Sequence, residues 1–131
     1  GKKKELFFYK NRNIFKKFKD KIIYILVTDT PYRYPNIDIK KRQQWLNEYH
    51  QRNSISHGIN SIGNLNDNDL IIISDVDEIP DPDTLSDIKK GIIKVNINIL
   101  QMDMYYYNLN TRFHKKWEAV RIISYNKYTS F

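Results

Sequence analysis

The sequence has no cysteine among its 131 residues, and it has only four glycines and four prolines. The lack of cysteine excludes disulfide bonds and metal sites built from thiolates. No apolar run approaches the ~18 residues that a membrane span needs, so no membrane segment is expected in this chain. The hydrophobic fraction of 40% and the charged fraction of 28% are typical of a soluble globular protein. A chain of this length is expected to form a single domain over residues 1–131.

Acidic residues are outnumbered by basic ones, 15 to 22, which gives a net charge of +7. A positive net charge of this size is found in proteins that bind nucleic acid, an anionic membrane or a phosphorylated small substrate. The lysines are scattered along the chain, however, and most aromatic residues fall on apolar stripes. We therefore expect no nucleic-acid partner, and keep a basic nucleic-acid-binding module as an alternative.

The most informative stretch runs from Asp69 to Asp81 and reads DLIIISDVDEIPD. Its apolar run, Leu70–Ile73, predicts a strand that is buried on both faces. Three acids follow within four positions: Asp75, Asp77 and Glu78. Carboxylates this close repel one another, so they need a cation, a positive ligand or a shared proton. This strand end is the predicted functional centre.

The predicted strands and helices alternate along the first part of the chain and are followed by further strands. This order predicts an α/β fold with a mixed, mostly parallel sheet. In such sheets, ligands lie beyond the carboxyl ends of strands, where Asp29 and Asp75 are expected. Strands are predicted at residues 6–9, 21–28, 70–73, 97–107 and 118–125, and helices at 11–20, 40–62 and 83–90.

One face of the predicted helix 40–62 carries Glu48, Arg52, Ile55, Ile59 and Ile62, at spacings of 4, 3, 4 and 3 residues. Arg52 thus continues an otherwise buried face. Glu48, one turn earlier, is well oriented to form an ion pair with it.

An Asp-x-Asp pair at a strand end offers hard oxygen ligands that suit Mg²⁺ or Mn²⁺ bridged to phosphate oxygens. The alternative is a solvated turn, with Asp83 capping the next helix. A calcium loop starting at Asp75 is excluded, because its sixth and twelfth positions hold Pro80 and Ser86 instead of glycine and glutamate.

A haloacid-dehalogenase-like phosphatase is a second alternative, with one aspartate of the Asp75/Asp77 pair as nucleophile and the other as acid/base. Such enzymes normally continue with glycine and then threonine or valine. Here Glu78, Ile79 and Pro80 follow.

Two longer stretches, Trp45–Asn53 (WLNEYHQRN) and Asp69–Pro80 (DLIIISDVDEIP), resemble glycosyltransferase family 17. Residues 21–29, residues 104–110 and Trp117 support the resemblance. Its best-known members are β-1,4-mannosyl-glycoprotein β-1,4-N-acetylglucosaminyltransferases. The resemblance implies a GT-A-like nucleotide-sugar-binding fold and a Mn²⁺ or Mg²⁺ ion. It also implies inverting transfer of a sugar, typically N-acetylglucosamine, from a UDP-sugar donor to a glycan or glycoprotein acceptor.

The resemblance also assigns roles to residues of this chain. Asp75 and Asp77 would hold the metal and the donor, and Glu78 belongs to the same motif. Arg52 and Asn53 match the family's helix signature. Arg52 is expected either to face the donor or the acidic motif, or to form a buried pair with Glu48. Family members usually extend beyond both ends of this chain, so we expect a domain truncated at one or both ends.

Inverting transfer needs a base that deprotonates the acceptor hydroxyl. The candidates are Glu118, Asp103, Glu78 and His114, of which Glu118 is the first choice and Glu78 the next. Trp117 is expected either to pack in the core or to form a platform for the apolar face of a sugar. His114 lies in a polar stretch, and we expect it at the surface.

Overall fold

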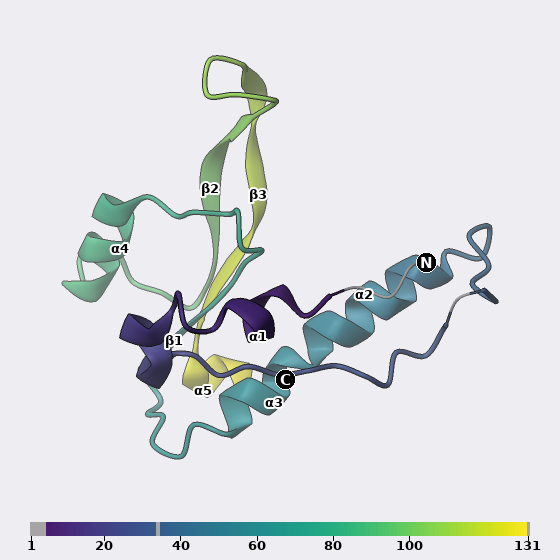
Figure 1. Cartoon of the computed structure of the whole chain (residues 1–131). Helices are drawn as coiled ribbons and strands as arrows, with labels where there is room; N and C mark the ends of the chain where they lie inside the picture. Colours follow the sequence, from purple (N-terminus) through teal and green to yellow (C-terminus); the bar gives the residue numbers. More distant parts are fainter. Residues whose placement is uncertain (1–4, 34, 131) are drawn as a thin grey trace. The chain divides into compact units, whose positions relative to one another are not determined.

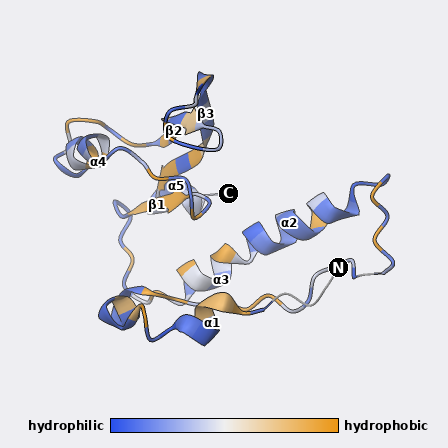
Figure 2. Cartoon of the chain, turned by 45° about the horizontal axis from the view of Figure 1, so that its top comes forward, coloured by the Kyte–Doolittle hydropathy of each residue, from blue (hydrophilic) through white to orange (hydrophobic). Residues whose placement is uncertain are grey.

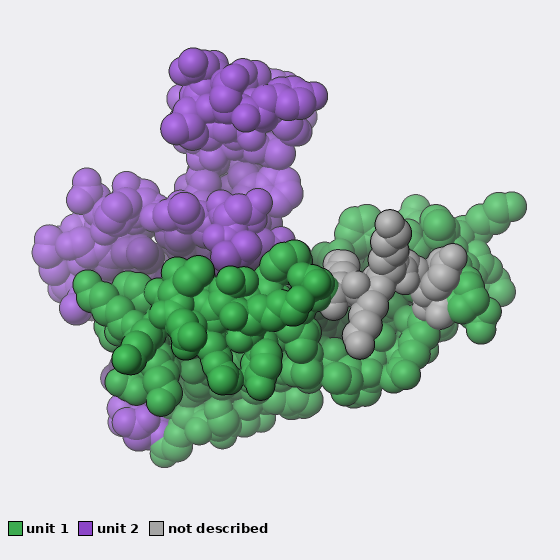
Figure 3. All heavy atoms as spheres, in the orientation of Figure 1, with its two compact units in different colours: residues 1–63 green, residues 64–131 purple. Residues whose placement is uncertain are grey.

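The computed structural model describes residues 5–33 and 35–130 (Figure 1). The chain divides into two compact units, residues 1–63 and residues 64–131 (Figure 3). The single domain expected from the length therefore stays a prediction.

The first unit is built from short helices and one extended segment. The predicted helix 40–62 is present as two helices, α2 and α3, separated by Ser54. Ser54 is buried, and its hydroxyl donates to the backbone carbonyl of His50 at 2.9 Å. A serine that bonds back to the preceding turn is typical of an irregularity in a helix. The helices are α1 (Phe7–Asn11), the 3₁₀ helix η1 (Lys16–Lys21), α2 (Gln43–Asn53) and α3 (Ile55–Asn60).

Three predictions for this unit are wrong. The predicted strand at 6–9 overlaps helix α1, and the predicted helix 11–20 is helical only at Asn11, which ends α1, and at residues 16–20, which belong to η1. The predicted strand at 21–28 is not present, because residue 21 ends η1 and the extended residues 22–30 join no strand within the described residues. Ile23 and Ile25 both lie against Gly58 of α3, at 3.7 and 3.6 Å from the place where a Cβ of residue 58 would stand. The segment thus packs on a helix through alternate residues, as an extended chain does.

In the second unit, the described residues 64–130 form a three-stranded sheet and two helices. Its strands follow the order β1-β3-β2, and both neighbouring pairs are antiparallel. The predicted mostly parallel sheet is therefore wrong for the described strands. The connection between β2 and β3 is short, and a short connection produces an antiparallel pair, whereas a parallel pair needs a long crossover. The elements are β1 (Leu70–Ile73), α4 (Pro82–Lys89), β2 (Ile97–Tyr105), β3 (Arg112–Ser124) and α5 (Tyr125–Tyr128).

Strand β1 is confirmed at its predicted position, but it is not buried on both faces. It forms an edge of the sheet, where Ile71 and Ile73 are half-buried while Leu70 and Ile72 are exposed. Strand β3 begins earlier than predicted, so His114 lies in a strand instead of a loop. Figure 2 shows β1 as hydrophobic and most of α2 as hydrophilic.

The core of this unit lies between the sheet and α4. Val120 and Ile122 of β3 are fully buried, and Leu100 of β2 and Ile88 of α4 pack against them. Val120 and Ile122 are two positions apart, so their side chains share one face of the sheet. The inward face of the sheet thus fixes the strand register, and this register positions the residues at the end of β1.

Helix α4 confirms the predicted helix 83–90 to within one residue. Its N-cap is Asp81, not Asp83: the Asp81 carboxylate accepts from the Thr84 backbone N–H and from the Thr84 hydroxyl, each at 2.8 Å. These two bonds lower the pKa of Asp81. Gly91 follows the helix with a φ of +75°, a conformation that suits glycine.

Candidate functional site

The acidic turn, residues Asp75–Glu78, begins two residues after β1 ends. The backbone N–H of Asp75 donates to Glu78 Oε2 at 2.7 Å, and the backbone N–H of Glu78 donates to the Asp75 carbonyl at 3.1 Å. These reciprocal bonds close the turn. Val76 at its tip is fully exposed, and the side chains of Asp75 and Asp77 lie at the surface. The turn therefore presents two carboxylates at the end of an edge strand.

Trp117 of β3 contacts the same turn. Its indole N–H donates to Glu78 Oε1 at 2.5 Å. Because β1 and β3 are antiparallel and Ile73 pairs with Arg121, β3 continues past the end of β1 toward residue 117. The sheet register thus brings a predicted substrate-binding aromatic residue to a predicted acidic site.

Glu78 uses both of its carboxylate oxygens in this arrangement. Oε1 accepts from the Trp117 indole and Oε2 accepts from the Asp75 amide. A carboxylate that already accepts two fixed donors is suited to holding a turn in one shape. Its predicted catalytic role stays a prediction.

Glu118, the first choice for the base, is exposed on β3. Its Oε1 accepts from Gln101 Nε2 on β2 at 2.6 Å, and its backbone carbonyl accepts from the Arg121 guanidinium. The strand is irregular here, since Leu100 pairs with Val120 but Met102 pairs with Trp117. Strand β3 therefore holds one more residue than β2 in this interval, which is a β-bulge, a feature common beside functional sites.

The other two candidates for the base are placed differently. Asp103 accepts from Lys116 Nζ at 2.7 Å and lies 3.7 Å from the Arg112 guanidinium. The hydrogen bond from Lys116 lowers the pKa of Asp103. This favours the charged form of Asp103, which pairs with Lys116 within the β2–β3 hairpin. His114 is exposed on β3, as expected, with its ring 4.3 Å from that of Phe113.

Arg52 and Asn53 lie at the end of α2 in the first unit. Arg52 Nη2 is 3.3 Å from Glu48 Oε1, so the predicted ion pair forms. It is not buried, because the side chains of Arg52 and Glu48 are 44% and 41% exposed. The predicted roles of Arg52 and Asn53 in donor binding stay predictions.

Sequence reasoning missed a polar network that ties the extended segment to α2. His50 Nε2 lies 3.1 Å from Asp29 Oδ1, and this hydrogen bond lowers the pKa of Asp29. Asn47 Oδ1 accepts from the Tyr32 backbone N–H at 3.0 Å, and Asn47 Nδ2 donates to the Tyr32 carbonyl at 2.8 Å. The only signal in the sequence is that Asn47 and His50 are three residues apart on one helix face.

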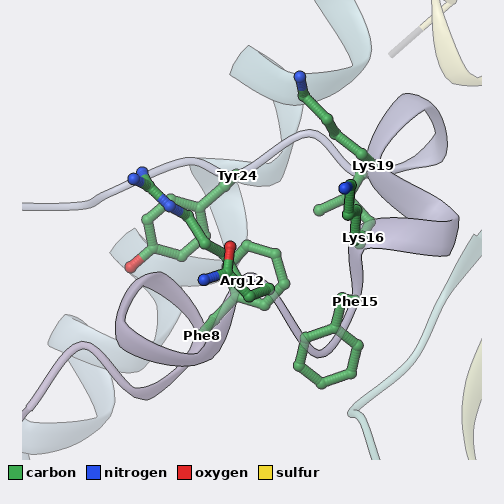
Figure 4. Close-up of a pocket in the computed structure, with 8 residues that line it drawn as sticks. Phe8, Arg12, Phe15, Lys16, Lys19 and Tyr24 are labelled. Carbon is green, nitrogen blue, oxygen red and sulfur yellow. The ribbon is translucent and has the colours of Figure 1, made fainter.

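A pocket in the first unit combines aromatic rings with positive charges (Figure 4). Its volume is about 470 Å³, and no acidic residue is among the described residues that line it. The Phe8 ring lies 5.5 Å from Phe15 and 5.1 Å from Tyr24 between ring centres. Rings and cations together suit an anionic ligand with a flat ring. The pocket is lined by Phe8, Arg12, Asn13, Phe15, Lys16, Lys19, Ile22 and Tyr24.

The fit of a metal ion to the acidic turn depends on how many ligands the protein supplies. Within residues 5–33 and 35–130, no group of three His, Asp or Glu side chains could hold a metal. Asp75 and Asp77 offer two carboxylates. Mg²⁺ keeps several waters and is often held by one or two carboxylates together with substrate phosphates. The two carboxylates could therefore supply only part of the ligands of such an ion, and the rest would come from a phosphorylated ligand and from water.

A sequence model of glycosyltransferase family 17 matches residues 1–131, the full chain. The chain therefore belongs to glycosyltransferase family 17. Glycosyltransferases transfer a sugar from a donor to an acceptor. No curated protein and no solved structure matches it. Among the helices of the described residues, none has the length and apolar character required to cross a membrane.

Proposed function

We propose that the protein is a metal-dependent, inverting glycosyltransferase with a GT-A-type nucleotide-sugar fold. It moves a sugar from a UDP-sugar donor, with N-acetylglucosamine as the first candidate, to a glycan or glycoprotein acceptor. The observation that carries the proposal is the acidic turn at the end of β1 in a chain that matches family 17 throughout its length.

Asp75 and Asp77 would hold the Mn²⁺ or Mg²⁺ ion. When bound, the ion offsets negative charge on the diphosphate leaving group. The turn suits this role because it keeps two carboxylates exposed while Glu78 is bonded to Trp117 and to the Asp75 amide. Two carboxylates leave positions on the ion for diphosphate oxygens.

Glu118 is the proposed base. In an inverting transfer, the acceptor oxygen bonds to the anomeric carbon as the bond from that carbon to the diphosphate oxygen breaks, and the acceptor proton passes to the base. The carboxylate of Glu118 is exposed and held by the neutral amide of Gln101. Asp103 is instead bonded to the charged Lys116. Trp117, directly before Glu118, would offer its partly exposed ring to the apolar face of a sugar.

Arg52 and Asn53 are proposed to contact the donor. A guanidinium group can hold two phosphate oxygens at once, which a lysine ammonium group does not do with the same geometry. The Arg52 side chain is 44% exposed.

The experiment that tests the proposal is measurement of UDP release from a set of UDP-sugars, with Mn²⁺ and with a chelator, in the presence of glycan acceptors. We expect metal-dependent release for the wild type and a loss of at least about 100-fold in Asp75→Asn and Asp77→Asn. Asp83→Asn, which changes an exposed acid on α4, is the matched control and is expected to keep activity. Equal activity in all of these variants would refute the proposal.

The family match favours sugar transfer over the phosphatase alternative. The nucleic-acid alternative gains one observation, the pocket lined by Arg12, Lys16 and Lys19 with aromatic rings. A nucleic-acid-binding surface predicts an affinity for oligonucleotides that falls steeply with salt. Its absence, together with metal-dependent UDP release, would leave the transferase as the sole function.

A further inference from the structure

Trp117, Glu78 and Asp75 form a continuous chain of hydrogen bonds. The Trp117 indole N–H donates to Glu78 Oε1 at 2.5 Å, and Glu78 Oε2 accepts the Asp75 backbone N–H at 2.7 Å. Glu78 thus connects β3, in the middle of the sheet, to the first residue of the acidic turn.

We propose that Trp117 is a positioning residue for the acidic turn. Acting through Glu78, it fixes the backbone at Asp75 and thereby the direction in which the carboxylates of Asp75 and Asp77 point. The inference rests on the proposed function for what the turn binds, namely a divalent cation together with a diphosphate. It assigns to Trp117 a role through its indole N–H, separate from that of a platform for a sugar ring.

The turn needs such a support because of where it lies. It follows a strand at the edge of the described sheet, and its tip residue Val76 is fully exposed. Three carboxylates within four positions repel one another. The two N–H groups that donate to the Glu78 carboxylate offset its charge and hold the turn closed.

The bulge in β3 explains how Trp117 reaches this position. Leu100 and Met102 are two positions apart on β2, so they share a face of the sheet. Their partners on β3, Val120 and Trp117, are three positions apart. The extra residue therefore brings Trp117 onto the face that carries Val120, whereas a regular strand would turn it to the other face.

Two substitutions separate the indole N–H from the bulk of the ring. Trp117→Phe keeps an aromatic side chain but removes the indole N–H donor. Glu78→Gln replaces the charged carboxylate that accepts this N–H by a neutral amide. We expect each to weaken the binding of Mn²⁺ with UDP about tenfold. We also expect the KM for the metal–donor pair to rise more than kcat falls. A role in fold stability alone would lower thermal stability without changing the affinity of the folded protein.

The bond itself can be followed without any activity. The chain has two tryptophans, Trp45 and Trp117, so its NMR spectrum has two indole N–H signals. We expect Glu78→Gln to shift the Trp117 signal and to speed its exchange with solvent, while the Trp45 signal stays unchanged. Trp117→Phe assigns the signals by removing one.

The outcomes distinguish this inference from the proposed function. An unmoved Trp117 signal in Glu78→Gln, or wild-type affinity for Mn²⁺ with UDP in a folded Trp117→Phe protein, would overturn the positioning role. If Trp117→Phe does not fold, the Glu78→Gln signal and affinity decide alone. If the wild type binds no UDP in the presence of Mn²⁺, the proposed function fails and the positioning role toward that ligand is overturned with it, even where the shifted signal shows that the bond exists.

Discussion

Ile73, the last residue of β1, pairs with Arg121 of β3 in an antiparallel register. The chain therefore leaves the sheet for the acidic turn beside the strand that carries Trp117 and Glu118. One register thus gathers the two proposed metal-binding carboxylates, the connecting glutamate and the proposed base within a single unit of the chain.

The first prediction concerns Arg52. Arg52→Lys should weaken UDP binding about tenfold or more, because lysine cannot hold two phosphate oxygens as a guanidinium does. Stability should change little, since exposed ion pairs on helices contribute only about 0.3–0.5 kcal/mol. Titration calorimetry with UDP and Mn²⁺ measures the effect. Glu48→Gln breaks the same ion pair but keeps the guanidinium; an equal loss of affinity in this control would show that the pair itself is what matters.

The core of the second unit gives a prediction about stability. Ile122 is fully buried against Ile88 and Leu100, so Ile122→Ala should lower the free energy of unfolding by about 2–5 kcal/mol. Ile92→Ala removes the same atoms from an exposed position and should cost no more than about 0.5 kcal/mol. Urea denaturation followed by circular dichroism compares them. A similar loss of unfolding free energy in both variants would show that Ile122 does not belong to the core of this unit.

The cap of α4 gives a paired test. Asp81 accepts two hydrogen bonds from Thr84, whereas Asp83 lies in the first turn of the helix. Asp81→Ala should therefore lower the thermal midpoint more than Asp83→Ala, because only the former leaves an uncapped helix end. The reverse order in a thermal scan would assign the cap to Asp83.

The pair of Asp103 and Lys116 predicts a dependence on pH. Because the pKa of Asp103 is lower in the folded protein than its ordinary value of 3.8, its contribution to stability is present above that value. The contribution is lost as the pH falls from 3.8 through the lower folded-state pKa. Wild type should thus be more stable than Asp103→Asn at pH 7, with the gap closing in the acid range. A gap that does not depend on pH would argue against this ion pair.

Local patterns in the sequence predicted three elements of the second unit, β1, α4 and β2, close to their observed bounds. The apolar run at 70–73, the proline and glycine around 83–90 and the long apolar stretch from residue 97 each correspond to an observed element. Strand direction was not predictable from these patterns. It depends on which strands pair, and the alternation of elements favoured parallel pairing, whereas β3 pairs with both neighbours in the antiparallel sense.

The residues of the acidic turn were predictable because three charges follow an apolar run. Their connection to Trp117 was not, since Glu78 and Trp117 are 39 positions apart and meet only through the register and the bulge of β3. The apolar composition of residues 21–28 predicts a buried strand, but these residues join no strand of the described chain. Ile23 and Ile25 pack against Gly58 of α3 instead of against a neighbouring strand. An apolar composition alone therefore does not distinguish a strand of a sheet from an extended segment that packs on a helix.

The central claim is that the acidic turn binds the diphosphate of a nucleotide-sugar donor through a divalent cation. The most direct measurement is calorimetric titration of UDP into wild type, Asp77→Asn and Asp83→Asn, with and without Mn²⁺. Binding is predicted only with Mn²⁺, and only in wild type and Asp83→Asn. Binding of UDP to Asp77→Asn with wild-type affinity, or to the wild type equally well in a chelator, would contradict the claim.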